Sequence, residues 1–372
     1  MPSLLIYLHE RTERGLMIRF LLSIALVFLL WGGVIAQTSA PKFSNEFLAI
    51  GVGARGLAMS GNQVANVSDV TAGYWNPAGL LNIRNKYEFS LMHAEYFAGI
   101  AQYDYAAFAT PIDSSSHLAL SLIRFAIDDI PDTRFLYDAN GAINYDNIRF
   151  FSAADYAFLI SYARKLPVLN GLKMGANFKV IHRIAGNFAN AWGFGLDVGA
   201  QMDHRDWKFG LMINDITGTF NAWSHNSSLV FDVYTQTGNE IPDNSVEITL
   251  PRATLGVARY FPVHSRFGLE VALDLVSSFD GRRNVLIKSD LISVDPAMAL
   301  EMNYKQMVFL RFGAGDVQEV KDFDSSTYHT FQPNFGLGFN VKKITVDYAL
   351  TDIGDQSESL YSHVFSVKAG LD

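Results

Sequence analysis

Apolar and polar side chains alternate residue by residue along much of this chain. In the stretch 191–202, every second residue is apolar: Trp192, Phe194, Leu196, Val198, Ala200 and Met202. The residues between them are small or polar: Gly193, Gly195, Asp197, Gly199 and Gln201. A period of two is the pattern of a β-strand, whose successive side chains point to opposite faces. The stretch therefore predicts a strand with one apolar and one polar face.

The same alternation predicts about fourteen strands in the last three quarters of the chain. In 172–183 the pattern is interrupted, because Lys173 and Lys179 lie beside apolar neighbours. The predicted strands are 87–97, 102–111, 117–127, 155–165, 172–183, 191–202, 207–215, 252–261, 266–275, 296–304, 307–315, 331–340, 343–351 and 362–371.

The predicted strands have about 9–12 residues each, which decides between two fold classes. Strands of soluble sandwiches usually have five or six residues, whereas a tilted strand that crosses a bilayer needs about 9–11. With an even number of strands, this length predicts an all-β fold: a transmembrane antiparallel up-and-down β-barrel at 85–372. The apolar face would then contact lipid and the polar face the lumen. Trp192, Trp207, Tyr260 and Tyr304 would belong to the interfacial aromatic girdle.

The connections between the predicted strands alternate in length, as the two ends of such a barrel require. With the N-terminus placed in the periplasm, the turns at that end are tight. The connections at the outer end are mostly long: 128–154, 216–251, 276–295, 316–330 and 352–361, with only 98–101 and 184–190 short.

The first residues resemble a secretory signal peptide. Arg11, Arg14 and Arg19 precede the apolar run 20–31, and small Val34 and Ala36 follow. We expect cleavage after Ala36, so that 1–36 is a signal peptide; either Met1 or Met17 could be the start. The alternative is a transmembrane anchor, for which the run is short.

Residues 37–84 precede the first predicted strand and do not alternate. They are rich in Gly, Ala and Ser, with a short helix expected near 57–66. We expect this segment to fold inside the lumen as a hatch, since small residues allow close packing against the wall. A periplasmic extension is the alternative.

Two motifs in this segment carry a family resemblance. "GARGLAMSG" and "VANVSDVTAGYWNPAGL" resemble the N-terminal signature of the PorV/PorQ family, and the C-terminal stretch that begins at Asn334 is similar to its closing hairpin. These proteins are FadL-like outer-membrane barrels of the type IX secretion system. The resemblance assigns a hatch motif to Gly53, Arg55, Gly56, Trp75, Asn76, Pro77 and Gly79.

The resemblance leaves two functions open. A PorV-like barrel would bind the secretion translocon and cargo sorting domains through its outer loops. A FadL-like transporter would instead pass long-chain fatty acids or other hydrophobic solutes across the outer membrane. The inward positions counted in the sequence are largely Gly, Asp, Gln, Glu and Asn, which favours the binding function. Aromatic residues are the usual anchors of protein recognition, so candidates for partner binding are Phe135, Tyr137, Phe220, Trp223 and Tyr234.

Composition excludes several other classes. The chain has no Cys, and its net charge of −8 gives no support to a nucleic-acid partner. The nine His are scattered, and no Gly-x-Ser-x-Gly elbow occurs. We therefore expect no enzyme activity, no cofactor and no metal site. The acidic loop residues, such as Asp128 and Asp129, could be solvated, bind calcium or contact lipopolysaccharide through divalent ions.

Overall fold

The structure is a computed structural model that describes residues 44–138, 140–167, 171–322, 326–351 and 362–372. The predicted signal peptide 1–36 and the predicted connection 352–361 lie outside this part of the chain. Among the described residues, no helix is long and apolar enough to span a bilayer.

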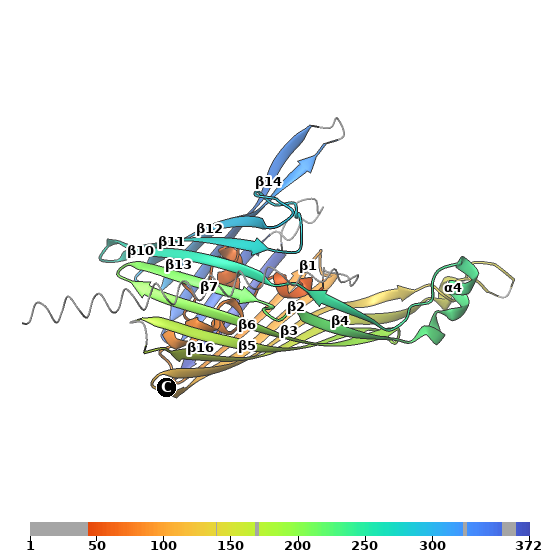
Figure 1. Cartoon of the computed structure of the whole chain (residues 1–372), viewed down its shortest axis with the longest axis horizontal. Helices are drawn as coiled ribbons and strands as arrows, with labels where there is room; N and C mark the ends of the chain where they lie inside the picture. Colours follow the sequence, from red (N-terminus) through yellow and green to blue (C-terminus); the bar gives the residue numbers. More distant parts are fainter. Residues whose placement is uncertain (1–43, 139, 168–170, 323–325, 352–361) are drawn as a thin grey trace, which may run out of the picture. The chain divides into compact units, whose positions relative to one another are not determined.

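All fourteen predicted strands are present, and they close into a barrel (Figure 1). The ring is closed because β1 pairs with β16 and β5 pairs with β6, and neighbouring strands are antiparallel throughout. The strands of the ring are β1 (Tyr87–Tyr96), β2 (Ala101–Asp113), β3 (Ser116–Asp132), β4 (Arg149–Lys165), β5 (Leu172–Ala185), β6 (Ala189–His204), β7 (Trp207–Asn214), β10 (Arg252–His264), β11 (Phe267–Ser278), β12 (Ser293–Tyr304), β13 (Val308–Lys321), β14 (Thr327–Val341), β15 (Ile344–Thr351) and β16 (Ser362–Leu371).

Two further strands, β8 (Thr219–His225) and β9 (Ser245–Thr249), continue β7 and β10 beyond an interruption. On β6, Val198 pairs with Ile213 of β7, but Phe194 already pairs with Phe220 of β8. Three residues of β6 thus face six of the β7–β8 chain, which is a large β-bulge. The predicted connection 216–251 was therefore too long, because both of its ends are strands and the loop is only 226–244.

A buried charge cluster lies at this interruption. Lys179 of β5 lies 2.7 Å from Asp197 of β6 and 2.5 Å from Asp215 in the bulge, and its side chain is 5% exposed. The backbone N–H of Asp215 donates to Asp197 at 2.9 Å. Lys179, which interrupted the sequence pattern, thus faces the lumen, where its charge has partners.

The two faces of the strands differ as the alternation predicts. Trp192, Phe194 and Leu196 are 50%, 40% and 40% exposed, whereas Asp197 and Gln201 are 2% and 3% exposed. The outer face of β6 is therefore apolar, as a barrel solvated by hydrocarbon requires.

The prediction for the aromatic girdle was wrong at Tyr260. Trp192, Trp207 and Tyr304 are exposed on the outer face. On β10, however, exposed Leu255 and Phe261 occupy the odd positions, so Tyr260 points inward, where Gln306 donates to its hydroxyl at 3.3 Å.

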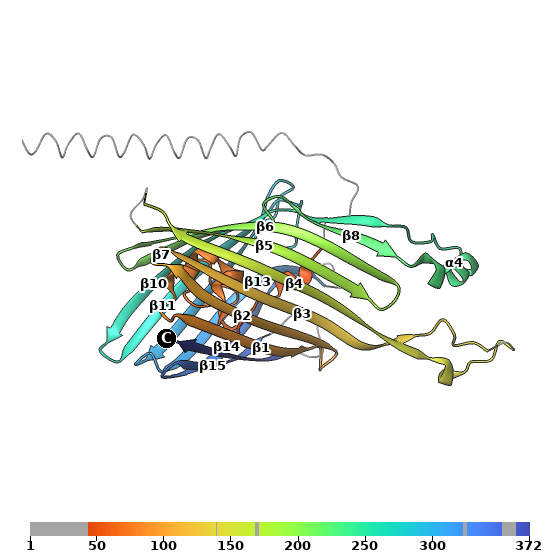
Figure 2. The ribbon, with the colours of Figure 1, turned by 90° about the horizontal axis from the view of Figure 1, so that it is seen from below.

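The two ends of the barrel have different connections. At one end, called the tight-turn end, the turns between strands are short, for example 114–115, 205–206 and 342–343. At the other, called the long-loop end, strands continue past the predicted limits: β3 and β4 have 17 residues each and leave a loop of only 133–148. Figure 2 shows this loop at the same end as α4 (Phe231–Thr237). The short elements η3 (Tyr145–Asn147) and η4 (Ser227–Leu229) also lie in these loops.

A charge on the outer face tests whether hydrocarbon surrounds it. We expect Leu300→Arg, at the middle of β12, to lower the free energy of unfolding by about 2–4 kcal/mol, whereas Val308→Arg, at the first residue of β13, should cost at most about 1 kcal/mol. Urea unfolding of protein in lipid vesicles measures both. Equal losses for the two variants would contradict the assignment.

Candidate functional site

Residues 44–83, called the N-terminal segment below, lie inside the ring of strands (Figures 1 and 2). The expected helix at 57–66 does not form: the helix ends at Ala58, and Ser60 and Gly61, both at positive φ, terminate it. The segment instead contains four short turns: η1 (Glu46–Ala49), α2 (Ala54–Ala58), α3 (Ala72–Trp75) and η2 (Pro77–Asn82).

Arg55 of α2 attaches this segment to the charged part of the inner wall. Its guanidinium lies 2.9 Å from Glu301 of β12 and 3.3 Å from Glu270 of β11. Arg311 of β13 reaches the same Glu301 at 2.6 Å and also Asp347 of β15 at 2.6 Å. Burial alone would lower the pKa of Arg55, but the carboxylates of Glu301 and Glu270 raise it above its ordinary value. Arg55 therefore remains charged inside the barrel.

Two acidic residues make further attachments. Asp69 lies 2.6 Å from Lys368 of β16. Burial would raise the pKa of Asp69, but Lys368 holds it well below its ordinary range. On β11, Asp274 accepts the backbone N–H groups of Gln63 and Val64 at 3.1 and 3.2 Å. Inward-facing charges thus fix the segment at several separate points.

Two glycines of the predicted hatch motif lie at the start of α2, and Trp75 explains one of them, Gly56. Its indole N–H donates to the carbonyl of Val52 at 3.0 Å, so the ring lies across the start of α2. A Cβ on Gly56 would be 2.8 Å from this ring, which leaves room for glycine only. Gly53 has φ +77°, a conformation that glycine adopts without strain. The structure therefore brings Gly53, Gly56 and Trp75 together, with Arg55 between the two glycines.

Asn76 begins η2 and links the segment to the strands. Its side chain accepts the N–H of Ala78 at 3.2 Å and donates to the carbonyl of Ala200 on β6 at 3.0 Å. Pro77 occupies the first position of η2, where its missing N–H costs nothing.

Close backbone contact explains the glycines at this turn. A Cβ on Gly79 would be 2.6 Å from the carbonyl oxygen of Val67. On the wall, a Cβ on Gly175 of β5 would be 2.6 Å from the backbone of Pro77. The Asn76–Gly79 turn therefore packs directly onto β5 and β6.

A second part of the inner wall, on β1–β5, is apolar and aromatic, contrary to the expected polar lumen. On these strands the alternation has apolar residues on both faces. Tyr96 and Tyr103 are fully buried, and their hydroxyls have no hydrogen-bond partner among the described residues. Burial raises the pKa of nearby Tyr74 to about 12. The buried inward residues are Met92, Tyr96, Tyr103, Tyr105, Ile123, Leu159 and Ile181, and Leu48, Ile50, Tyr74 and Trp75 of the segment pack on them.

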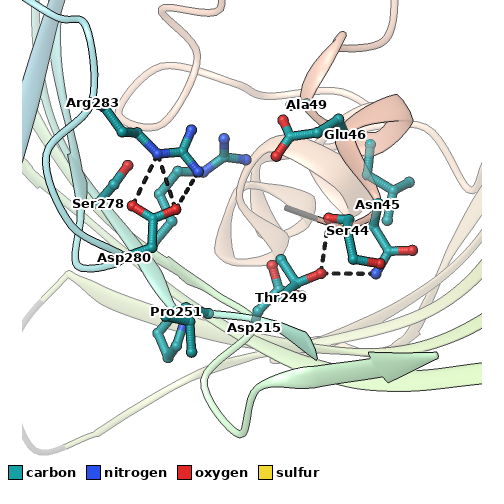
Figure 3. A pocket seen from close by; sticks show the side chains of 13 residues that line it. Ser44, Asn45, Glu46, Ala49, Asp215, Thr249, Pro251, Ser278, Asp280 and Arg283 are labelled. Atoms are coloured by element: carbon teal, nitrogen blue, oxygen red, sulfur yellow. Dashed lines mark hydrogen bonds and ion pairs between the residues drawn. The ribbon is translucent and has the colours of Figure 1, made fainter. Parts of the chain in front are cut away.

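Two cavities adjoin the N-terminal segment, and both have several charged residues in their lining. Figure 3 shows the first, where Thr249 donates to the carbonyl of Ser44 at 2.9 Å and accepts from Asn45 at 3.0 Å. Its volume is about 40 Å³, enough for ordered water only. The second has about 350 Å³ at the tight-turn end, with Asp203 and Lys208 in its lining. Neither cavity suits a hydrocarbon in this closed arrangement.

The five aromatic candidates for partner binding do not form one surface. Phe135 and Tyr137 are exposed in the β3–β4 loop, with Arg149 over the Phe135 ring at 4.4 Å. Tyr234 lies on α4. Phe220 and Trp223 lie on β8 instead of a loop, and Phe220 contacts the outer-face ring of Phe194 at 6.0 Å. Among the described residues, no three His, Cys, Asp or Glu side chains are grouped to hold a metal.

The geometry therefore defines a closed fourteen-strand barrel whose lumen is filled by its own N-terminal segment. No protein-family model and no curated protein matches the chain. Solved structures match it over most of its length. The toluene transporter TbuX of Ralstonia pickettii is 14% identical, with TM-score 0.50 over 87% of this chain and 99% of that one. The toluene transporter TodX of P. putida is 13% identical, with TM-score 0.52 over 86% and 99%. The monoaromatic hydrocarbon channel CymD is 10% identical, with TM-score 0.53 over 87% and 98%. At this identity the likeness establishes the fold alone.

A side chain at Gly175 should displace the N-terminal segment. We expect Gly175→Val to expose Ala78, which is fully buried, because the new methyl groups occupy the position of the Pro77 backbone. Maleimide labelling of an Ala78→Cys variant measures this exposure without background, since the chain has no Cys. Ala176→Val, on the outer face of the same strand, is the control and should leave labelling slow. Slow labelling of the Gly175→Val variant would show that a side chain at position 175 does not displace the N-terminal segment.

Proposed function

We propose that this chain is an integral protein of the bacterial outer membrane that takes up hydrophobic small molecules through a FadL-like barrel. The apolar outer face and the signal-like N-terminus support the location. Its structural neighbours are transporters and channels, which also argues against an enzyme.

The observation that carries the proposal is the aromatic inner wall of β1–β5. It lies toward the long-loop end, since Tyr96 and Tyr103 are close to the β1–β2 turn. A ligand that replaced Leu48 and Ile50 of the N-terminal segment on this wall would lose water from its apolar surface, which is the main source of affinity in such sites. Uptake then requires that the charge contacts of Arg55 and Asp69 separate, so that the segment can move.

This proposal is tested by ligand binding to matched variants. We expect Ile123→Asn, on the inner face of β3, to weaken the binding of a fluorescent long-chain fatty acid or of toluene by about fivefold or more, because an amide buried against a ligand that offers it no hydrogen-bond partner costs about 1–3 kcal/mol. Leu122→Asn, the next residue but on the outer face, should bind normally. If the purified protein binds neither probe, or both variants bind alike, uptake by this wall is excluded.

A second candidate function is a PorV-like role in type IX secretion, which the N-terminal and C-terminal sequence motifs favour. The long β3–β4 and β8–β9 hairpins extend the barrel at one end and expose Phe135, Tyr137 and Phe231. Such surfaces suit the binding of a cargo sorting domain or of the translocon.

Removal of the α4 loop tests this second function. We expect a chain lacking 226–244, with β8 and β9 joined by a short turn, to form the barrel but to lose cargo sorting domains in affinity purification from native membranes. Retention of the same cargo by the shortened chain would contradict the role of this loop.

A further inference from the structure

A group of polar and ionisable side chains lies on the outer face of β1–β3, above an apolar part of the same wall. Nδ1 of His93 lies 2.7 Å from Asp104, and Nη1 of Arg124 lies 3.0 Å from the other oxygen of Asp104. Glu95 is 3.9 Å from Nε2 of His93 and its side chain is 64% exposed. We call these four residues the polar belt. Figure 2 shows their strands side by side on one wall.

The polar belt continues onto β16 and β15. Glu95 pairs with His363 across the β1–β16 contact. Nδ1 of His363 lies 2.7 Å from the hydroxyl of Tyr348 on β15. Polar side chains therefore cross the outer face of five neighbouring strands.

The height of the belt is unusual for a barrel wall. Glu95 lies eight residues above Tyr87, the first residue of β1, which corresponds to a climb of about 20 Å in a strand tilted by roughly 40°. The apolar band of an outer-membrane barrel is about 25 Å tall, so the belt lies within it. Exposed Phe89 and Leu91 lie below the belt, and exposed Phe97 and Ile100 lie above it.

On β6, on another side of the barrel, the apolar band is taller. There, exposed or partly exposed apolar side chains continue from Met202 to Trp192 without a charge. A wall whose apolar band is shorter than the hydrocarbon layer of the bilayer exposes polar side chains to lipid tails. When two such walls associate, these side chains no longer contact lipid.

We propose that the wall of β1–β3 is the contact surface of a homodimer, related by a twofold axis parallel to the membrane normal and next to β2. Such an axis keeps every residue at its own height in the membrane. The apolar side chains of one copy therefore contact apolar side chains of the other, and the two polar belts contact each other. It also brings β3 of one copy opposite β1 of the other. Arg124 lies eight residues above Ser116, the first residue of β3, the same count as Glu95 on β1. Arg124 of one copy therefore faces Glu95 of the other.

A lipid headgroup fits this wall less well than a second copy. The belt has two carboxylates against one permanent cation, which repels lipid phosphates, and Asp104 is already held by Arg124 and His93. Phe97 and Ile100 above the belt would lie among the sugars of lipopolysaccharide.

Charge reversal tests the dimer with the full chain in lipid vesicles. Arg124→Glu should lower the association constant at least about tenfold, because like charges then face each other across the axis. The double variant Arg124→Glu with Glu95→Arg should restore association, since it exchanges the partners across the axis. The single variant Glu95→Arg, which leaves the Arg124–Asp104 pair intact, should weaken association as Arg124→Glu does. Arg259→Glu, an outward arginine on the distant β10, is the control and should leave association unchanged.

Cross-linking gives an independent measurement. An Ala106→Cys variant, on the outer face of β2, should form a dimer with a short bis-maleimide, and a Met298→Cys variant on β12 should not. A protein that is monomeric at all protein-to-lipid ratios, or that cross-links only through position 298, overturns the proposal. So does Arg124→Glu if it leaves association intact, or if its effect is only the loss of co-purified lipopolysaccharide from a monomer.

Discussion

Closure of the sheet is the constraint on which the rest of this structure depends. A strand edge in hydrocarbon would leave its N–H and C=O groups without partners, so every strand needs two neighbours. The pairings β1–β16 and β5–β6 provide the last of these. Once the ring is closed, alternate side chains must face inward, and the protein has to fill or hydrate that interior. This requirement accounts for the N-terminal segment and for the glycines that let it approach the wall.

Two parts of the inner wall contact the N-terminal segment through different interactions. On β11–β16, Glu301 pairs with Arg55 of the segment, and Lys368 pairs with Asp69. Asp274 instead accepts backbone N–H groups of the segment. On β1–β5, tyrosines and aliphatic residues pack on η1 and α3. The first part positions the segment, and the second offers an apolar surface once the segment moves. A polar attachment beside an apolar surface is consistent with a closed state that can open.

Strand positions and facing could be predicted from the sequence because the period of two is imposed by the backbone itself. The ends of the strands were less predictable. β3 and β13 continue beyond the apolar band, where outward side chains no longer contact lipid and need not be apolar. Tyr260 was misassigned because an aromatic near a strand end was given more weight than its register with Gly256. The apolar inner wall was missed because strand 191–202, with its polar inward face, is not representative of β1–β3, where Tyr103 and Ile123 make both faces apolar. The contacts of Arg55 with Glu270 and Glu301 join residues more than 200 positions apart, and no local pattern contains them.

The interruption between β7 and β8 has a mechanical consequence. Its counterpart, the break between β9 and β10 at Leu250–Pro251, faces it across the same hairpin, so the β8–β9 arm is joined to the cylinder by two short non-strand links. Lys179 anchors the nearer link through Asp215, and the arm is held on the cylinder by the pairing of β6 with β8 and by the contact of Arg183 on β5 with Glu247 on β9. Movement of the arm away from the cylinder therefore has to break the β6–β8 pairing, whereas the strand pairings below the joint stay in place. Length changes in the loop at the tip of the arm need no change in strand number or shear.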